Sequence, residues 1–328
     1  MIAVKLTQLR YLAAIVDSGL NISAAADRLH ISQPGVSRQL KLLEDELGFE
    51  LFVRDGRQLE RLTPAGQRVL EKARRLLREA QSIKAMSLDA RDPNKGSLSI
   101  ATTHTQARYV LPSVIAQFRQ RYPQVKLHLQ QGTSEQIAEL LNDGQVDIAI
   151  STGARDKVPH CVLLPCYEWH RRVIVPKAHP LARHKTLSLT KLAQHPIVTY
   201  VFNLSGPASL PEAFAKAGLT PDIAITARDA DVIKTYVRLG LGVGIVAAMA
   251  LDPEQDSDLV SFDASQLFPR HLTWVGFRRG SFLRRYVLDF IQLVGPHLDR
   301  TTIHKAERSE TQLEVDALFS GLSLPIYR

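Results

Sequence analysis

The segment from Ser32 to Gly48 constrains the fold most strongly, because it predicts one helix with two chemically different faces. Ser32 is a good N-cap, Pro34 is tolerated in a first helical turn, and Gly48 is a common helix end. One face is an apolar stripe with helical spacing, made of Val36, Leu40, Leu43 and Leu47. The other face is polar and carries Gln33, Pro34, Ser37, Arg38 and Lys41. We expect the stripe to pack on a small domain and the polar face to stay exposed.

The sequence on either side of this helix sets its context. A plain surface helix would also show two faces, since polar outer faces are normal. However, two shorter helices are predicted before it, one capped by Thr7 and ended by Gly19, the other capped by Asn21. After it, apolar segments on both sides of Asp55-Gly56 predict a hairpin. Helix, turn, helix and hairpin in this order predict an all-α winged helix-turn-helix in residues 1–62, with one exposed helix that fits a DNA major groove.

The polar face carries groups suited to nucleic acid. The Gln33 amide can read a base edge, and Ser37, Arg38 and Lys41 suit phosphates or guanine. The net charge of +8 agrees with a polyanionic partner. This charge is spread along the chain, since residues 1–95 carry 16 Lys and Arg against 12 Asp and Glu, and the remaining residues carry 25 against 21. The DNA prediction therefore depends on the motif and not on the net charge.

Residues 63–92 predict a long linker helix, with Thr63 as its cap and Pro64 at its first position. Apolar or small residues then recur at spacings of four and three, at Val69, Ala73, Leu76, Ala80 and Ile83. Such a heptad pattern predicts pairing with a second copy of the helix, although packing on its own domain would give a similar pattern. Asp92-Pro93-Asn94-Lys95-Gly96 breaks the pattern and predicts a hinge.

From Ser97 onward, predicted strands alternate with predicted helices, which indicates an α/β domain with mostly parallel sheets. Two clusters of similar size indicate two lobes with a cleft between them. We expect this domain to span residues 93–300. Its lobe I would comprise 96–164 and 268–300, and its lobe II 165–267. The tail of residues 301–328 has mixed charge and no predicted role.

Three polar segments follow predicted strands of this domain: 102–106, 151–153 and 203–206. Ligands of such sheets bind at the carboxyl ends of strands, near helix N-termini. The segments offer hydroxyl, amide and N–H groups with no acid close by in the sequence, which suits a small anion or a carboxylate. Any one of them would also fit ordinary helix capping, but three together predict a ligand site.

Several function classes are disfavoured by what the sequence lacks. It has no apolar run of the ~20 residues that a membrane helix needs, and its start does not resemble a secretion signal, so we expect a cytoplasmic protein with no membrane partner. Cys161 and Cys166 are its only cysteines and cannot build a Cys-only zinc site, so no metal is expected.

Two other functional classes compete with DNA binding. An enzyme is disfavoured because the sequence shows no nucleophile elbow, P-loop or zinc motif. Gly240-x-Gly242-x-Gly244 precedes a predicted strand instead of following one, which indicates a turn and not a nucleotide loop. A solute-binding protein of transport would fit the second half of the chain. The winged helix and the missing secretion signal disfavour it.

The N-terminal motifs resemble those of the LysR-type transcription regulators. The matching segments are 32–39, 43–48, Leu51-Phe52-x-Arg54 and 62–66. Within that family the chain resembles the CysB branch, which regulates sulfur assimilation and cysteine biosynthesis. The segments that carry this second resemblance are 101–109, 164–169 and 226–244. The resemblance extends to about Leu298 and implies a two-lobed, periplasmic-binding-protein-like effector domain.

The resemblance also implies partners and site residues. It implies promoter DNA, a homodimer formed through the linker helix, a homotetramer, RNA polymerase, and no cofactor other than a small effector such as acetylserine, sulfate or thiosulfate. The implied DNA-binding residues are Gln33, Pro34, Ser37, Arg38, Lys41 and, in the wing, Arg54. The implied effector residues are Thr103, Thr105, Gln106, Thr152, Trp169 and Ser205, the last standing where threonine is usual in that branch. A regulator of alkanesulfonate or other organosulfur use is the alternative.

Overall fold

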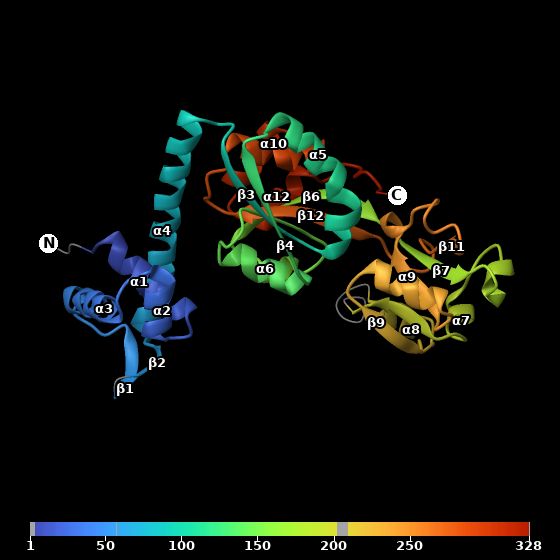
Figure 1. Ribbon diagram of the computed structural model, residues 1–328, viewed down its shortest axis with the longest axis horizontal. Coiled ribbons are helices and arrows are strands. Elements are labelled where there is room, and N and C mark those ends of the chain that lie inside the picture. The colour runs from blue at the N-terminus through green and yellow to red at the C-terminus, as the bar shows by residue number, and fades with distance from the viewer. Residues whose placement is uncertain (1–3, 57, 202–208, 328) are drawn as a thin grey trace. The chain divides into compact units, whose positions relative to one another are not determined.

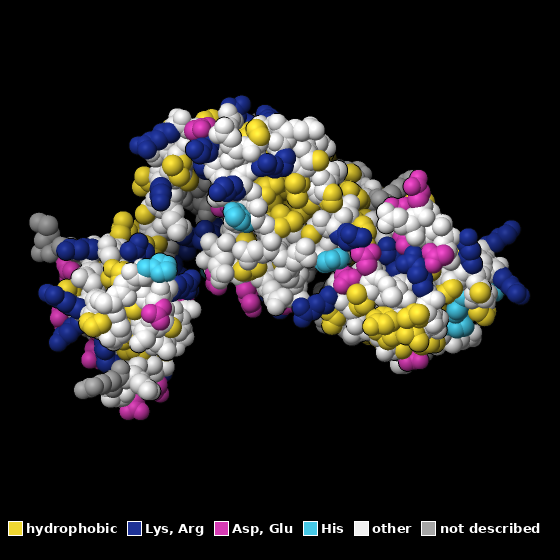
Figure 2. All heavy atoms as spheres, in the orientation of Figure 1, with side chains coloured by type: hydrophobic (Ala, Val, Ile, Leu, Met, Phe, Trp, Pro, Cys, Tyr) yellow, Lys and Arg dark blue, Asp and Glu magenta, His cyan; other side chains and the backbone are white. Residues whose placement is uncertain are grey.

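The computed structural model describes residues 4–56, 58–201 and 209–327. The chain divides into two units, residues 1–91 with 280–282 and residues 92–279 with 283–328 (Figure 1). Among the described residues, no helix is both long and apolar enough to span a lipid bilayer. On the face in Figure 2, both units carry Lys and Arg side chains as well as Asp and Glu side chains, so charge alone singles out no binding surface on this face.

The first unit is a three-helix domain with a two-stranded wing and a long helix. Its elements are α1 (Leu6–Asp17), α2 (Ile22–Leu29), α3 (Gln33–Leu47), β1 (Phe52–Asp55), β2 (Gln58–Leu62) and α4 (Pro64–Arg91). Strands β1 and β2 pair antiparallel. The core includes the fully buried side chains of Leu12, Ile15, Val36, Leu43 and Phe52. This arrangement confirms the winged helix-turn-helix and the long helix that follows it.

Local capping explains most of these boundaries. The side chain of Asn21 accepts the Ala24 N–H at 3.0 Å, and that of Thr63 accepts the Gly66 N–H at 2.9 Å. Gly48 ends α3 in the left-handed region, at a φ of 75°. The predicted Thr7 cap is wrong, because α1 begins at Leu6 with Lys5 as its N-cap, two residues before the predicted cap. Glutamine at the third helical position stabilises this start by accepting the Lys5 N–H at 2.8 Å.

The apolar residues of the heptad pattern in α4 are buried in the first part of the helix and exposed in the second part. Its first turns pack on the domain, where Ala73 is buried and Val69 is half-buried within the same core. Farther along, Leu76 and Ile83 are 51% and 68% exposed. The first part of the predicted seam is therefore used within the chain, and the second part leaves apolar side chains on the surface of the helix.

The second unit contains two five-stranded sheets. The first has the order β4-β3-β5-β12-β6, and the second β11-β7-β10-β8-β9. The strands of the first sheet are β3 (Gly96–Thr102), β4 (Val125–Gln131), β5 (Ile148–Ser151), β6 (Cys161–Trp169) and β12 (His271–Arg278). Those of the second are β7 (Arg171–Pro176), β8 (Ile197–Tyr200), β9 (Ile223–Ala227), β10 (Val243–Ala247) and β11 (Leu259–Asp263).

Each sheet has four strands in one direction and one reversed strand, which agrees with the predicted mostly parallel sheets. The reversed strands are β12 and β7. Each of them enters its sheet directly from the other lobe, after β11 and β6 respectively. A strand that enters from the neighbouring lobe starts at the side where the lobes meet and runs away from it. The other four strands run toward that side, so their carboxyl ends gather there.

Helices and short turns complete the two lobes (Figure 1). The first lobe contains a π-helical turn at Gln106–Val110 and the helices α5 (Leu111–Arg121), α6 (Ser134–Asn142) and α10 (Arg285–Val294). The second contains α7 (Leu189–Leu192), α8 (Leu210–Lys216) and α9 (Ala230–Arg238). Short 3₁₀ turns lie at Arg155–Lys157, Pro180–Arg183 and Ala248–Ala250.

Two expected boundaries differ from the structure. Strand β6 pairs with β12 along its length, so lobe I extends to Trp169 and not to residue 164. The tail is also part of lobe I, as α11 (Arg300–Arg308) and α12 (Gln312–Leu318) bury Ile303 and Val315 in its core. The Gln312 amide forms two hydrogen bonds with the backbone of Leu163 in β6, at 2.8 and 3.0 Å. Helix α11 contributes only Ile303 and Ala306 to the core, and α12 contributes only Val315, too few residues for a recognisable periodic pattern.

Candidate functional site

Helix α3 presents its two faces as the sequence predicts. Val36, Leu40 and Leu43 are at most 2% exposed, whereas the predicted DNA-binding side chains lie on the surface. Gln33, Pro34, Arg38 and Lys41 are exposed and Ser37 is half-buried. The Gln33 amide nitrogen donates to the Ser37 hydroxyl at 3.1 Å, so these two polar groups are held one turn apart on the same face. The helix therefore has the exposure that groove binding requires; the role of each residue stays a prediction.

Arg54 is placed differently from the other predicted DNA-binding residues. Its guanidinium lies 2.5 Å from a carboxylate oxygen of Glu44, a buried residue of α3. The other oxygen of Glu44 accepts the Leu51 N–H at 2.8 Å. Glu44 thus ties the wing to the back of α3. Arg54 positions the wing in addition to any contact it makes with DNA.

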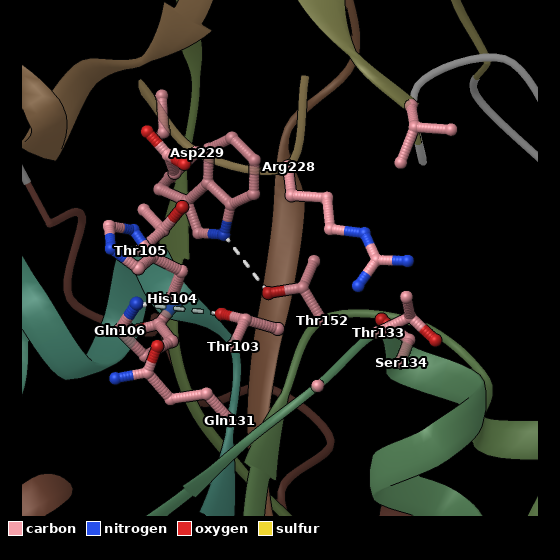
Figure 3. A pocket seen from close by; sticks show the side chains of 14 residues that line it. Thr103, His104, Thr105, Gln106, Gln131, Thr133, Ser134, Thr152, Arg228 and Asp229 are labelled. Atoms are coloured by element: carbon pink, nitrogen blue, oxygen red, sulfur yellow. Dashed lines mark hydrogen bonds between the residues drawn. The ribbon is translucent and has the colours of Figure 1, made fainter. Parts of the chain in front are cut away.

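The second unit contains a pocket of about 280 Å³ between its two lobes. Residues at the carboxyl ends of strands from both sheets line the pocket. Examples are Thr152 after β5, Trp169 at the end of β6 and Arg228 after β9. Five of the predicted effector residues line it: Thr103, Thr105, Gln106, Thr152 and Trp169 (Figure 3). The sixth, Ser205, lies outside the described residues.

A hydrogen-bond network holds three of these residues in place. The Trp169 indole N–H donates to the Thr152 hydroxyl at 3.3 Å, as drawn in Figure 3. The hydroxyls of Thr152 and Thr273 lie 2.9 Å apart, and the Gln106 amide donates to Thr273 at 3.4 Å. The Tyr167 hydroxyl donates to the Gln106 carbonyl. Because Thr273 and Tyr167 are buried, the network fixes the orientation of Gln106, Thr152 and Trp169 from the buried side of the pocket.

Thr103 and Thr105 stand at the start of the helix that leads into the π-helical turn. The Thr103 hydroxyl accepts the Gln106 N–H at 3.4 Å, so it caps that helix beside the pocket. π-Helical turns often lie at functional sites, and a helix N-terminus favours anions. Thr105 faces Tyr200 of the other lobe, where burial dominates and raises the Tyr200 pKa to about 12, although Thr105 acts to lower it. The pocket wall of lobe I thus faces a neutral phenol of lobe II.

A second contact joins the lobes beside the pocket. Tyr109 donates to Asp231 of α9 at 2.8 Å, and Arg108 lies 2.6 Å from the other carboxylate oxygen. Lys234, which is buried, lies 3.3 Å from the same carboxylate. Burial alone would raise the pKa of Asp231, but the Tyr109 hydrogen bond and the charges of Lys234 and Arg108 outweigh it and lower the pKa. Asp231 is therefore a carboxylate shared by both lobes.

The structure adds pocket residues that the sequence analysis did not identify: Gln131, Thr133, Ser134, Arg228 and Asp229. Arg228 and Asp229 directly follow strand β9. The criterion that found the other three segments, polar residues just after a strand, applies to them equally. The three predicted segments have no acid close by in the sequence, but Asp229, from a fourth segment, lines the pocket, and one of its oxygens accepts the Val232 N–H at 2.8 Å.

Comparisons with known proteins agree with this architecture. Residues 6–67 match the model of bacterial regulatory helix-turn-helix proteins of the lysR family, and residues 91–299 match the LysR substrate binding domain. This chain belongs to the LysR family of transcription regulators. It is 49% identical over 320 residues, 98% of this chain and 99% of the relative, to the HTH-type transcriptional regulator CysB of Haemophilus influenzae. That similarity supports the CysB branch.

Two solved LysR structures extend this result. The cofactor-binding domain of the Cbl transcriptional regulator is 41% identical with a TM-score of 0.62, covering 66% of this chain and 95% of that one. Full-length CbnR complexed with its target DNA is 26% identical with a TM-score of 0.54, covering 89% and 99%. The LysR chain is therefore a DNA-binding, effector-binding regulator and not an enzyme, and its helix-turn-helix excludes a transport solute-binding protein.

Proposed function

We propose that this LysR regulator controls genes of sulfur assimilation and cysteine biosynthesis by binding a small sulfur-pathway metabolite or anion in the inter-lobe pocket. Acetylserine, sulfate and thiosulfate are the candidate effectors. The observation that carries the proposal is the convergence of Thr103, Thr105, Gln106, Thr152 and Trp169 on one pocket at the carboxyl ends of strands. The similarity to a CysB regulator along nearly the whole chain supports the same regulon.

The proposed mechanism couples the pocket to DNA through the oligomer. Two copies pair through α4, whose exposed Leu76 and Ile83 need a partner surface, and two dimers form a tetramer. The two α3 helices of each dimer read two half-sites through Gln33, Pro34, Ser37, Arg38 and Lys41, and the two dimers bridge separate sites. Because the pocket is lined by both lobes, a ligand favours one arrangement of the lobes and shifts the population of tetramer shapes. RNA polymerase is the proposed recipient of that change at cytoplasmic promoters.

A thermal-shift panel tests the effector assignment. The full chain is heated with acetylserine, sulfate, thiosulfate or an alkanesulfonate, and a ligand that binds the native state raises the unfolding midpoint. We expect Thr103→Ala to reduce the shift given by the effector and to leave promoter binding in a mobility-shift assay unchanged. Thr301→Ala, at an exposed threonine of α11, is the matched control.

Two results would refute parts of this proposal. A full thermal shift in Thr103→Ala would show that the effector binds elsewhere. A shift with the alkanesulfonate and not with the other ligands would favour the organosulfur regulon instead.

A further inference from the structure

Arg228 is the only Lys or Arg among the described residues that line the inter-lobe pocket. It follows β9 of the second lobe, and its side chain is exposed. In Figure 3 the guanidinium points toward the part of the pocket where Thr133 and Ser134 lie. The Thr103 and Thr105 groups belong to the opposite wall, in lobe I. Among the described lining residues, hydroxyl groups of lobe I therefore lie both near Arg228, at Thr133 and Ser134, and away from it, at Thr103 and Thr105.

The neighbouring cations of the same lobe are held by carboxylates. Lys234 pairs with Asp256 at 3.0 Å, and Arg238 pairs with Asp256 and Asp258 at 2.9 and 2.7 Å. Across the cleft, Arg108 pairs with Asp231. Within the described part of the chain, Arg228 has neither an ion pair nor a side-chain hydrogen bond. An exposed guanidinium that lines a pocket and has its five donors available suits a planar carboxylate, which it binds through two parallel hydrogen bonds.

Size and charge argue against a bare oxyanion as the sole occupant. A volume of 280 Å³ equals roughly nine water molecules at ~30 Å³ of liquid volume each, well beyond a five-atom tetrahedral anion. Asp229 lies beside Arg228 and also lines the pocket. Its negative charge disfavours a compact dianion at this end, whereas a single carboxylate held by the arginine fork carries half that charge.

We infer that Arg228 binds a carboxylate of the effector, while a second oxygen-rich group of the same molecule meets the threonines of lobe I. The effector is then a small carboxylic acid that spans the pocket, and not inorganic sulfate alone. This inference rests on the proposed function, because it takes the inter-lobe pocket as the effector site. It adds the residue that selects the chemical class of the ligand.

The test is isothermal titration of the full chain with three probes: N-acetylserine, its carboxamide, which lacks the carboxylate, and sulfate. Arg228→Gln keeps a polar side chain and removes the charge. We expect it to weaken N-acetylserine binding about tenfold and to change carboxamide and sulfate binding by less than about twofold. Arg228→Lys should recover only part of the loss, since an ammonium lacks the planar fork. Arg183→Gln, at another exposed arginine of the same lobe, controls for the lost charge and should change nothing.

The outcomes separate this inference from the proposed function. Loss of N-acetylserine binding in Thr103→Ala would support the pocket assignment. If, in addition, Arg228→Gln weakens binding of the acid and the carboxamide equally, or changes the binding of neither, the carboxylate assignment is overturned. If the wild-type chain binds sulfate and not N-acetylserine, the carboxylate assignment is overturned as well. If Thr103→Ala and Arg228→Gln both leave N-acetylserine binding intact, both proposals fail together.

Discussion

The polar face of α3 and the lining of the inter-lobe pocket use similar side chains in opposite ways. In α3, residues close in sequence form one exposed surface, and a single helix places them. In the pocket, the groups come from strand ends far apart in sequence, and buried partners such as Tyr167 and Thr273 fix their orientation. DNA binding by the first region depends on the exposure of its side chains. Effector binding by the second region depends on the buried residues that pack against the pocket lining. Changes to the core of the second unit should therefore leave the first unaffected.

The largest expected effect tests whether the tail is part of that core. Ile303 of α11 is fully buried in lobe I, so Ile303→Ala should lower the free energy of unfolding of the second unit by about 3 kcal/mol. Leu313→Ala, at a residue that is 81% exposed, is the control and should change it little. Chemical denaturation followed by tryptophan fluorescence reports this unit, which contains both Trp169 and Trp274. Equal stability of the two variants would show that the tail is dispensable.

The next effect concerns the exposed face of α3. Arg38→Ala removes one exposed cation and should weaken binding to any duplex about tenfold, with a shallower dependence of affinity on salt. A mobility-shift series across salt concentrations measures both quantities. Effector titration of the same variant should match the wild type. A change in effector affinity would contradict the separation of the two regions.

The buried side of the pocket gives a comparable test from the other region. Thr273→Val keeps the shape of the side chain but removes the hydroxyl that links Gln106 with Thr152. Because both groups then lose a fixed partner, we expect effector affinity to fall about fivefold to tenfold while DNA affinity stays unchanged. Calorimetric titration and mobility shift on one preparation measure both. Unchanged effector binding would show that the network does not orient the pocket.

The same contrast explains what the sequence could predict. The winged helix followed from local signals, namely the stripe of Val36, Leu40 and Leu43 and the hairpin at Asp55-Gly56. The predicted pocket residues followed partly from the rule that ligands meet strand ends, and partly from family resemblance. The role of Thr273 could not be predicted from the sequence, because the residue lies inside β12. No local sequence signal there distinguishes a buried threonine that supports pocket residues from an ordinary core threonine. The tail helices were missed because their core contacts are made with β6, far away in sequence.

The smallest expected effect is the pH dependence of the contact between the lobes at Asp231. The pKa of this carboxyl is lowered from its ordinary 3.8 in the folded chain, so the stabilisation is complete above that value and is lost as the pH falls below it. Asp231 and Arg108 are both partly exposed, so solvent screens their interaction. Asp231→Asn should therefore lower the unfolding midpoint of the second unit by only about 2 °C at neutral pH. The difference from the wild type should shrink as the pH falls below 3.8 and disappear once the pH lies below the lowered pKa of the folded chain, where both chains lack the charge. A difference that persists at that pH would mean that Asp231 acts through the Tyr109 hydrogen bond, and that the lobes are joined by neutral contacts on both sides of the pocket.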